Sequence, residues 1–498
     1  MGYIQKDAFR TMLLSYVGMV LGYVNKGFLF IFLLTSDQVG LINLVIAVGL
    51  LLAQMSNLGS IYAVWKFFPF FRNESKKHYG FLFMNMLIVA VGIILFLIIT
   101  LLLKTEITSF YLDKSALFVD YFFLILPIGA SMVYFYLFEN YMRGMNKNIL
   151  PVFLNEFMLR VLLTILLICF AFQWISFNQL IYTYAYTHFI PPTILLIYLI
   201  QKKEITFSLK AISIPKRFKR IIINYSAYSY INSIGIIIVL TLDAMMLASM
   251  VGLNATGVYT TIIYLISAIQ VPYKSLIRTS SPLIPVYWKE KKLTEMNALY
   301  KQVSSISLII SLFLFAVIWI NRIDLFSLLK PEYMQGIEVF LFLMIGRILD
   351  MYFGLNGTIF LTSKKYKYEI IFTLVMIGLV FGLNLLLIPS LGMKGAAIST
   401  AIALITFNLG RMIFIYYSYN MHPFEVNQLK VILLFFGLLF SIEFFAPTIS
   451  NLFLAVSARV IVFSIAFLAP IYFLNWNSDI VLYLNNGFKF LKKKFSRI

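Results

Sequence analysis

Charged residues are scarce in this sequence. Asp, Glu, Lys and Arg together make up only 12% of its 498 residues, whereas a soluble domain carries about 25%. Hydrophobic residues account for 61%, and the mean hydropathy is +0.91. The length alone would suit about three soluble domains. This composition excludes that arrangement and indicates a polytopic membrane protein, because too little polar surface is left to face water.

Groups that commonly carry catalysis or bind metals are also rare. The single cysteine, Cys169, lies in an apolar run and can form no internal disulfide. The three histidines, His78, His188 and His422, are far apart in the sequence. There is no cysteine cluster, no His-Glu-x-x-His and no glycine-rich phosphate loop. We therefore expect no enzyme activity, no metal and no cofactor. Energy for any transport would come from an ion gradient, from the substrate's own gradient or from another subunit.

Acidic residues are half as numerous as basic ones. Forty Lys and Arg against 20 Asp and Glu give a formal net charge of +20. In a soluble protein this excess would suggest nucleic acid as a partner. Here the charges lie between long apolar runs, so we expect the partner to be a lipid bilayer and not a nucleic acid.

Long apolar runs dominate the chain. A helix needs about 20 apolar residues to cross a bilayer core of about 30 Å, and the runs lack the alternating pattern of β-barrel strands. The sequence predicts an all-α polytopic protein with about 14 transmembrane helices. They lie near residues 11–34, 38–65, 79–103, 117–142, 149–171, 178–200, 221–251, 257–287, 302–326, 336–362, 369–390, 395–420, 431–448 and 452–474.

The basic residues predict the orientation of these helices. With alternating sides, twenty-eight of the 40 Lys and Arg fall on one side and five on the other. Because basic loops stay in the cytoplasm, both termini are expected there. The first apolar run is too long for a cleavable signal. Seven cations remain inside the runs: Lys26, Arg160, Lys274, Arg278, Arg347, Arg411 and Arg459.

A weak internal repeat divides the chain near its middle. Gly40 lies 29 residues before Pro69, and Gly257 lies 28 residues before Pro285. Each proline comes before a basic loop. This spacing predicts two six-helix lobes with parallel topology, followed by two extra helices. We expect an N-lobe at 1–200, a basic cytoplasmic linker at 201–220, a C-lobe at 221–420, two further helices at 421–474 and a basic amphipathic cytoplasmic tail at 475–498.

Polar residues form one stripe on each of the first two helices of each proposed lobe. Such stripes either face a cavity or form seams between packed helices, and Arg278 could also extend to the membrane interface. Packing does not require a cation, so we interpret the stripes as lining a cavity. The candidate substrate-binding residues are Lys26, Lys274, Arg278, Asn25, Asn57, Asn232 and Tyr264.

Other intramembrane charges are expected to neutralise one another. Glu156 and Arg160 are spaced i,i+4, and Arg347 and Asp350 are spaced i,i+3, so each pair shares a helix face. Glu443 and Arg459, on the last two helices, are expected to pair there. Asp243 has no partner nearby in the sequence. It could meet Lys26 or Lys274 across the cavity, or it could carry a coupling ion.

Short motifs are distributed along essentially the whole chain. They are Gln38-Val39-Gly40-Leu41, Leu58-Gly59, Lys66-Phe67-Phe68-Pro69, Leu242-Asp243, Gly257-Val258-Tyr259, Pro331-Glu332-Tyr333, Leu349-Asp350-Met351, Gly354, Asn356 and Gly392-Met393-Lys394-Gly395-Ala396-Ala397. In these motifs, and in their order along the helices, the chain resembles polysaccharide (O-antigen type) flippases of the multidrug/oligosaccharidyl-lipid/polysaccharide exporter (MOP) superfamily.

The resemblance implies that the two six-helix lobes surround a central cavity. It also implies a flippase of the bacterial cytoplasmic (inner) membrane. It would move an undecaprenyl-diphosphate-linked oligosaccharide across the bilayer by alternating access, for surface polysaccharide or lipopolysaccharide biosynthesis. Other polysaccharide-assembly membrane proteins would then be candidate partners. Related peptidoglycan-precursor flippases place basic residues on helices one and eight, where Lys26, Lys274 and Arg278 lie.

Three other functions remain open. A multidrug or cation antiporter of the same superfamily would favour buried carboxylates, whereas cations outnumber them here. A peptidoglycan-precursor flippase is a closer alternative. A membrane oligosaccharide polymerase or ligase usually carries a large outer loop, and no outer connection here exceeds about fifteen residues.

Overall fold

The computed structural model describes residues 2–73, 77–208, 216–445, 451–482 and 485, and these contain helices and no strands. Within them, twelve helices are long and apolar enough to cross a membrane, and a bent pair would be a thirteenth. The predicted tail and linker are only partly described: residues 478–482 are helical, while 209–215 and the basic stretch at 492–494 lie outside the described residues.

The described chain divides into two compact units. Unit 1 comprises Met1–Thr261 with Asn384–Met393, and unit 2 comprises Ile262–Leu383 with Lys394–Ile498. These boundaries differ from 200 and 221, where the internal repeat divides the sequence. The division into two six-helix lobes stays a prediction.

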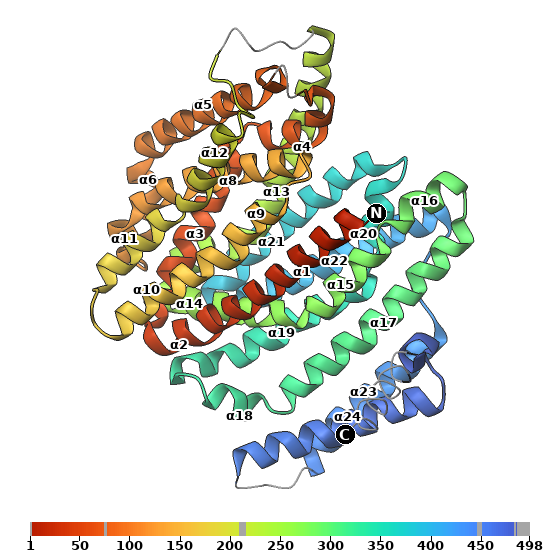
Figure 1. The fold of residues 1–498 in the computed structure, drawn as a ribbon. Coiled ribbons are helices and arrows are strands. Elements are labelled where there is room, and N and C mark those ends of the chain that lie inside the picture. The colour runs from red at the N-terminus through yellow and green to blue at the C-terminus, as the bar shows by residue number, and fades with distance from the viewer. Residues whose placement is uncertain (1, 74–76, 209–215, 446–450, 483–484, 486–498) are drawn as a thin grey trace, which may run out of the picture. The chain divides into compact units, whose positions relative to one another are not determined.

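Unit 1 contains the first thirteen α-helices and parts of α14 and α21 (Figure 1). Their bounds are α1 Gly2–Gly22, α2 Phe30–Leu33, α3 Ser36–Ser56, α4 Ser60–Phe71, α5 Phe81–Leu102, α6 Lys104–Leu112, α7 Ala116–Asp120, α8 Ile125–Gly144, α9 Ile149–Val152, α10 Leu159–Ala171, α11 Phe177–Thr187, α12 Ile190–Gln201, α13 Lys216–Met250, α14 Leu253–Ile269 and α21 Glu369–Leu391.

Unit 2 contains the remaining helices and the other parts of α14 and α21. Their bounds are α15 Val271–Ser280, α16 Leu283–Glu290, α17 Leu293–Trp319, α18 Arg322–Ser327, α19 Gly336–Phe353, α20 Asn356–Thr362, α22 Met393–Tyr419, α23 Val426–Phe445 and α24 Leu452–Phe473.

Some of the fourteen expected spans are interrupted. In the second, Leu58 and Gly59 have positive φ between α3 and α4. The eighth bends by 51° between Leu253–Ile269 and Val271–Glu290, at a point where Pro272 in the first turn of α15 has no backbone N–H to donate. The tenth stops at Gly354, whose φ of 52° ends α19 before α20 begins. With three charged residues among its 18, α19 is also too polar to count as a simple span.

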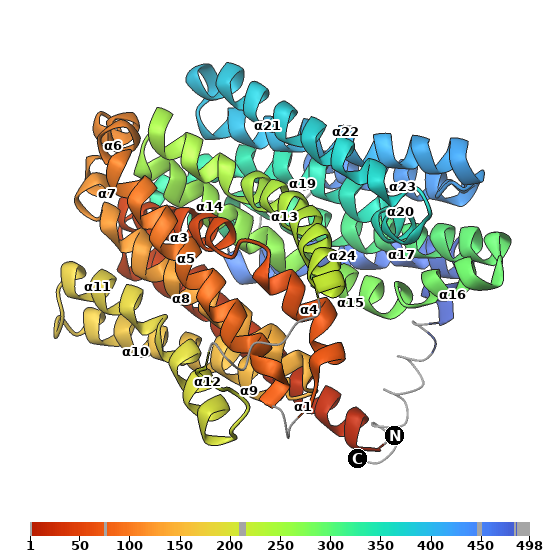
Figure 2. The same cartoon turned by 90° about the horizontal axis from the view of Figure 1, so that it is seen from above.

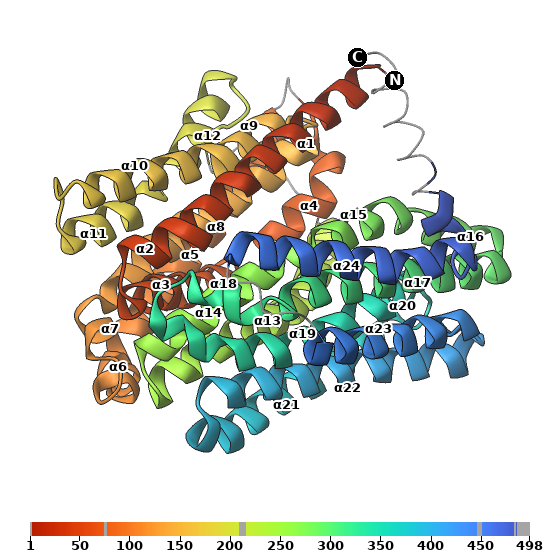
Figure 3. The same ribbon diagram turned by 90° about the horizontal axis from the view of Figure 1, so that it is seen from below.

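The first and fifth spans each contain a π-helical segment. These are Tyr23–Leu29, after α1, and Phe153–Met158, between α9 and α10. Helix α1 lies along the second of them (Figure 3). A Cβ on Gly18 would lie only 2.1 Å from the carbonyl oxygen of Glu156, so only glycine permits this approach. Such segments occur frequently at functional sites.

Helices α3 and α14 cross through a reciprocal pair of glycines (Figure 2). A Cβ on Gly40 would lie 2.0 Å from the carbonyl oxygen of Leu253, and a Cβ on Gly257 would lie 2.0 Å from that of Ser36. Gly257 follows Gly40 by 217 positions, and Leu253 follows Ser36 by the same number. This offset also separates Asn43 from its hydrogen-bond partner Thr260. Each glycine thus approaches the backbone at the same relative position of the other helix. This reciprocity supports the internal repeat.

The start of the linker is anchored on unit 1 by buried polar groups. The Glu204 carboxylate lies 2.7 Å from Nε2 of His78 and accepts a bond of 2.9 Å from Lys147. The Asn73 amide donates to Nδ1 of the same imidazole at 3.1 Å, so Nε2 carries the hydrogen. Burial raises the pKa of Glu204, but the hydrogen bonds from His78 and Lys147 outweigh it and lower that pKa overall.

The last two long helices contact each other and α17 (Figure 1). The expected Glu443–Arg459 pair is wrong. Glu443 pairs with Arg322, and Arg459 pairs with Asp324, both in the short helix α18. Helix α18 provides a cation, Arg322, within reach of Glu443 and a carboxylate, Asp324, within reach of Arg459.

Candidate functional site

The seven intramembrane cations differ in how they are neutralised. Four form ion pairs with carboxylates: Arg160 with Glu156 at 2.5 Å, Arg347 with Asp350 at 3.6 Å, Arg411 with Glu369, and Arg459 with Asp324. Lys26 donates to the Asn43 side-chain oxygen at 3.3 Å. Within the described part of the chain, Lys274 and Arg278 form no ion pair.

Lys274 and Arg278 project from one face of α15, four residues apart, and both are exposed. The helix is held at both ends: Tyr273 donates to the Gly354 carbonyl at 3.3 Å, and the Ser281 and Thr358 hydroxyls lie 3.1 Å apart. Arg347 lies close enough for its charge to act on Lys274. Cations therefore exceed carboxylates in this part of unit 2.

Lys26 occupies the π-helical segment of the first span. Its acceptor, Asn43 on α3, also donates to the Thr260 hydroxyl on α14 at 2.9 Å. The positive charge of Arg160 acts on Lys26 as well. The adjacent Asn25 is fully buried, donates to the Arg160 carbonyl at 2.8 Å and accepts from Thr164 at 2.8 Å. The geometry thus gives Asn25 the role of joining two helices, while Lys26 remains a candidate for binding.

The other three candidate residues lie in different settings. The Asn57 side chain donates to the Gln54 carbonyl at 2.6 Å and accepts from the Gly59 amide at 2.8 Å, so it stabilises the turn between α3 and α4. Among the described residues, the buried side-chain oxygen of Asn232 has no hydrogen-bond partner. Tyr264 lies in the part of α14 that belongs to unit 2. Binding by Asn232 and Tyr264 stays a prediction.

Asp243 is 6% exposed and is positioned by two residues that sequence reasoning missed. It accepts from the Tyr259 hydroxyl at 2.6 Å and from the Asn384 side chain at 2.8 Å. Asn384 is 141 residues away along the chain, so no local pattern could have found it. Lys26 and Asp243 are also 217 positions apart. The offset of the predicted repeat therefore relates two residues of opposite charge.

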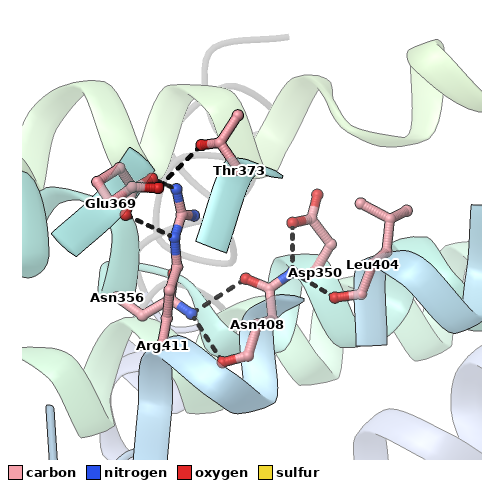
Figure 4. Close-up of polar contacts among 7 residues, drawn as sticks. All are labelled: Asp350, Asn356, Glu369, Thr373, Leu404, Asn408 and Arg411. Atoms are coloured by element: carbon pink, nitrogen blue, oxygen red, sulfur yellow. Dashed lines mark hydrogen bonds and ion pairs between the residues drawn. The ribbon is translucent and has the colours of Figure 1, made fainter. Parts of the chain in front are cut away.

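Unit 2 holds a group of buried and half-buried polar side chains (Figure 4). Asn408 donates to Asp350 at 2.9 Å, and Asn356 donates to Asn408 at 3.0 Å. Beside them, the Arg411 guanidinium pairs with Glu369, which is 4% exposed. The sequence showed Arg411 as an intramembrane cation but did not reveal Glu369 as its partner, because 42 residues separate them.

Cations without carboxylate partners in a membrane region can attract an anionic group strongly, because the local dielectric constant is low. Among the described residues, no group of three or more His, Cys, Asp or Glu side chains is arranged to hold a metal ion. Lys26 belongs to unit 1, whereas Lys274 and Arg278 belong to unit 2. Their participation in a single site stays a prediction.

No family model and no curated protein sequence matches this chain. Solved transporters of the MOP superfamily share its fold. The lipid II flippase MurJ, in an inward closed conformation, aligns with a TM-score of 0.72 and 12% identity over 93% of this chain and 99% of MurJ. An inward-facing multidrug resistance MATE family transporter aligns with a TM-score of 0.65 and 12% identity over 83% of this chain and 98% of its own.

A third similar structure is a MOP superfamily transporter from Pyrococcus furiosus, described as having a binding pocket of reverse polarity. It aligns with a TM-score of 0.53 and 15% identity over 84% of this chain and 96% of its own. At such identities the likeness shows the fold alone. It confirms the predicted class, an all-α polytopic protein with the fold of MATE and MurJ transporters.

The Arg411–Glu369 pair generates a prediction about stability. Arg411→Met leaves the Glu369 carboxylate buried without its partner, which should lower the free energy of unfolding by about 3–5 kcal/mol. The double variant Arg411→Met/Glu369→Leu should recover most of that loss. Unfolding from mixed micelles by titration with a denaturing detergent measures both.

Lys394 and Glu338 provide the matched control, because their ion pair is more exposed, at 35% and 62% of the side chains. Lys394→Met should cost less than about 1 kcal/mol. Equal losses for Arg411→Met and Lys394→Met would contradict a structural role for the buried pair.

Proposed function

We propose that this protein is a flippase that moves an undecaprenyl-diphosphate-linked oligosaccharide across the bacterial inner membrane by alternating access. The observation that carries the proposal is the pair Lys274 and Arg278, exposed on one face of α15 with no carboxylate partner among the described residues. Lys26, which donates to the Asn43 side-chain oxygen at 3.3 Å, is assigned to the same role in unit 1.

The physical argument is the cost of charge in a membrane. An ionisable side chain in a transmembrane segment is expensive, and most such groups pair with an opposite charge. Arg160, Arg347, Arg411 and Arg459 do so here. Cations that do not pair internally are best explained by an anionic ligand. A diphosphate offers several oxygen acceptors to such cations and forms charge-assisted hydrogen bonds with them.

The shared fold supports a transporter and narrows the alternatives. MurJ, a flippase of lipid II, resembles this chain over nearly all of its length. A peptidoglycan precursor is therefore the second candidate substrate, and it would use the same cations for its diphosphate. A multidrug antiporter is less well supported, because the excess of cations would repel an organic cation.

Replacing the cations provides the first test of this function. Lys26→Ala, Lys274→Ala and Arg278→Ala should each slow translocation of the lipid-linked oligosaccharide by about tenfold or more, since a hydrogen bond to a charged group contributes about 1.5–3 kcal/mol. The assay is transport into the outer leaflet of proteoliposomes, with lipid II as the second substrate.

Lys292→Ala is the matched control, because Lys292 is exposed and pairs with the exposed Glu290 at 2.8 Å. It should transport at the wild-type rate. The proposal is wrong if all three intramembrane variants fold and also keep that rate. Faster transport of lipid II than of the oligosaccharide would support a flippase mechanism with a peptidoglycan precursor as the substrate.

We further propose that Asp243 couples transport to an ion gradient. Its carboxylate is buried, and beside it the side-chain oxygen of Asn384 is buried without a partner among the described residues. A small cation bound at the Asn384 oxygen would give that oxygen a partner, and a cation or a proton would neutralise the neighbouring carboxylate. Asp243→Asn should abolish the dependence of transport on an imposed gradient, measured in the same vesicles.

The exposed Asp37→Asn serves as the control and should leave the gradient dependence intact. Full gradient dependence in Asp243→Asn would remove Asp243 from coupling.

We propose that the α3–α14 crossing is the outer gate of the transporter. The basic residues assign this end of both helices to the outer side, and Asn254 donates to the Ser36 hydroxyl there at 2.6 Å. In a Cys169→Ala background, Ser36→Cys/Asn254→Cys should form a disulfide on oxidation and stop transport, and reduction should restore it.

A protease site engineered into the 201–220 linker allows the chain to be cut between the two cysteines. The two fragments then run as one band on a non-reducing gel only if the disulfide has formed. Ser36→Cys alone is the control and should transport under both conditions. Full transport by the cross-linked protein would show that this crossing does not open.

A further inference from the structure

A polar pocket lies in unit 2, away from the residues discussed above. Its volume is about 560 Å³, within the range of about 300–1,000 Å³ found for small-molecule sites. Three segments form its walls: the first turns of α17, the start of α23, and residues 475–479 after α24. The distribution of basic residues assigns these segments to the cytoplasmic side.

The lining of this pocket is unlike the rest of the chain. Of its twelve lining residues, Ala298 alone has no polar side-chain atom. Small-molecule pockets are usually lined predominantly by apolar groups, whereas polar groups predominate in this lining. Trp476 supplies one aromatic surface. The pocket therefore suits a ligand with many hydrogen-bonding groups.

Several of the lining side chains are held in place by one of their polar atoms. Gln302 donates to Asp479 at 2.8 Å, which joins α17 to the segment after α24. Ser305 donates to Glu425 at 3.0 Å, and the His422 amide donates to the Asn297 oxygen at 3.1 Å. The second oxygen of each carboxylate and the amide nitrogen of Asn297 have no further hydrogen bond within the described residues. They remain able to bind a ligand.

The charges of the pocket distinguish it from the intramembrane cations. Lys301 is its one cation among the lining residues, against Glu425 and Asp479. Phosphate would be repelled by the excess of carboxylate. Hydroxyl groups, which both donate and accept, match this mixture of amide donors and carboxylate acceptors. The apolar face of a sugar ring fits against an indole.

We propose that this pocket binds a neutral sugar residue on the cytoplasmic side of the protein. Such a sugar has two possible sources: a free saccharide, or the glycan of a lipid-linked substrate. Binding of a free saccharide does not rest on the proposed flippase function, and the two are tested separately.

The test uses the detergent-solubilised full chain labelled with 5-fluorotryptophan. The chain has five tryptophans, and Trp476→Phe identifies the fluorine resonance of Trp476 by its loss. Glucose, galactose, mannose, rhamnose and N-acetylglucosamine are each added up to about 10 mM, enough to detect a Kd near 1 mM. At least one sugar should shift the Trp476 resonance saturably.

Glu425→Gln keeps the size of the side chain and removes its charge, and it should weaken this binding at least tenfold. Lys289→Ala, on α16 outside the pocket, is the control and should bind as the wild type does. The proposal is overturned if no sugar shifts the resonance, or if sodium pyrophosphate shifts it and the sugars do not.

Transport then separates the two sources of the sugar. Slower translocation of a lipid-linked oligosaccharide by Glu425→Gln, with sugar binding also weakened, assigns the pocket to the substrate's glycan. Unchanged translocation with weakened sugar binding assigns it to a soluble saccharide. Failure of the flippase assay alone would leave the binding result intact.

Discussion

The structure depends on one constraint: charges placed among apolar helices must be neutralised within the protein or by a ligand. Glu369 and Arg411 satisfy this constraint in unit 2, and Glu156 and Arg160 satisfy it in unit 1. Lys274 and Arg278 do not satisfy it with any described carboxylate. The function proposed above follows from this difference, since an anionic ligand would complete what the protein leaves open.

Close backbone approaches are the second organising feature. Gly18 lets α1 contact the π-helical segment at Glu156, and Gly40 and Gly257 let α3 and α14 cross. In each case a Cβ would overlap a carbonyl oxygen, so packing requires glycine. The two contacts at the crossing are reciprocal, since each glycine approaches the residue that lies four positions before the other glycine. This reciprocity supports a repeat that was weak in the sequence.

Equivalent positions of the predicted repeat differ in their chemistry. Lys26 and Asp243 occupy equivalent positions 217 residues apart. One donates to Asn43, and the other accepts from Tyr259 and Asn384. A cation in one half and a carboxylate in the other are suited to different ligands. This division agrees with a protein that binds an anion through one set of residues and senses an ion through another.

The class of the fold could be read from the sequence because hydrophobic run length and the scarcity of charge are local properties. The prediction of fourteen spans was less accurate where Pro272 and Gly354 interrupt the helices. The expected Glu443–Arg459 pair was wrong because the true partners, Arg322 and Asp324, are 121 and 135 residues away. Local spacing carries no information about such contacts.

By itself, the sequence determined that the chain is helical, spans a membrane and carries more intramembrane cations than carboxylates. Only the tertiary structure decided which of those cations are neutralised. It paired Arg411 with Glu369, joined Asn25 to α10 and left Lys274 and Arg278 exposed on α15. The reason is that burial in a bilayer is a property of single segments, whereas neutralisation depends on distances between segments far apart in the chain.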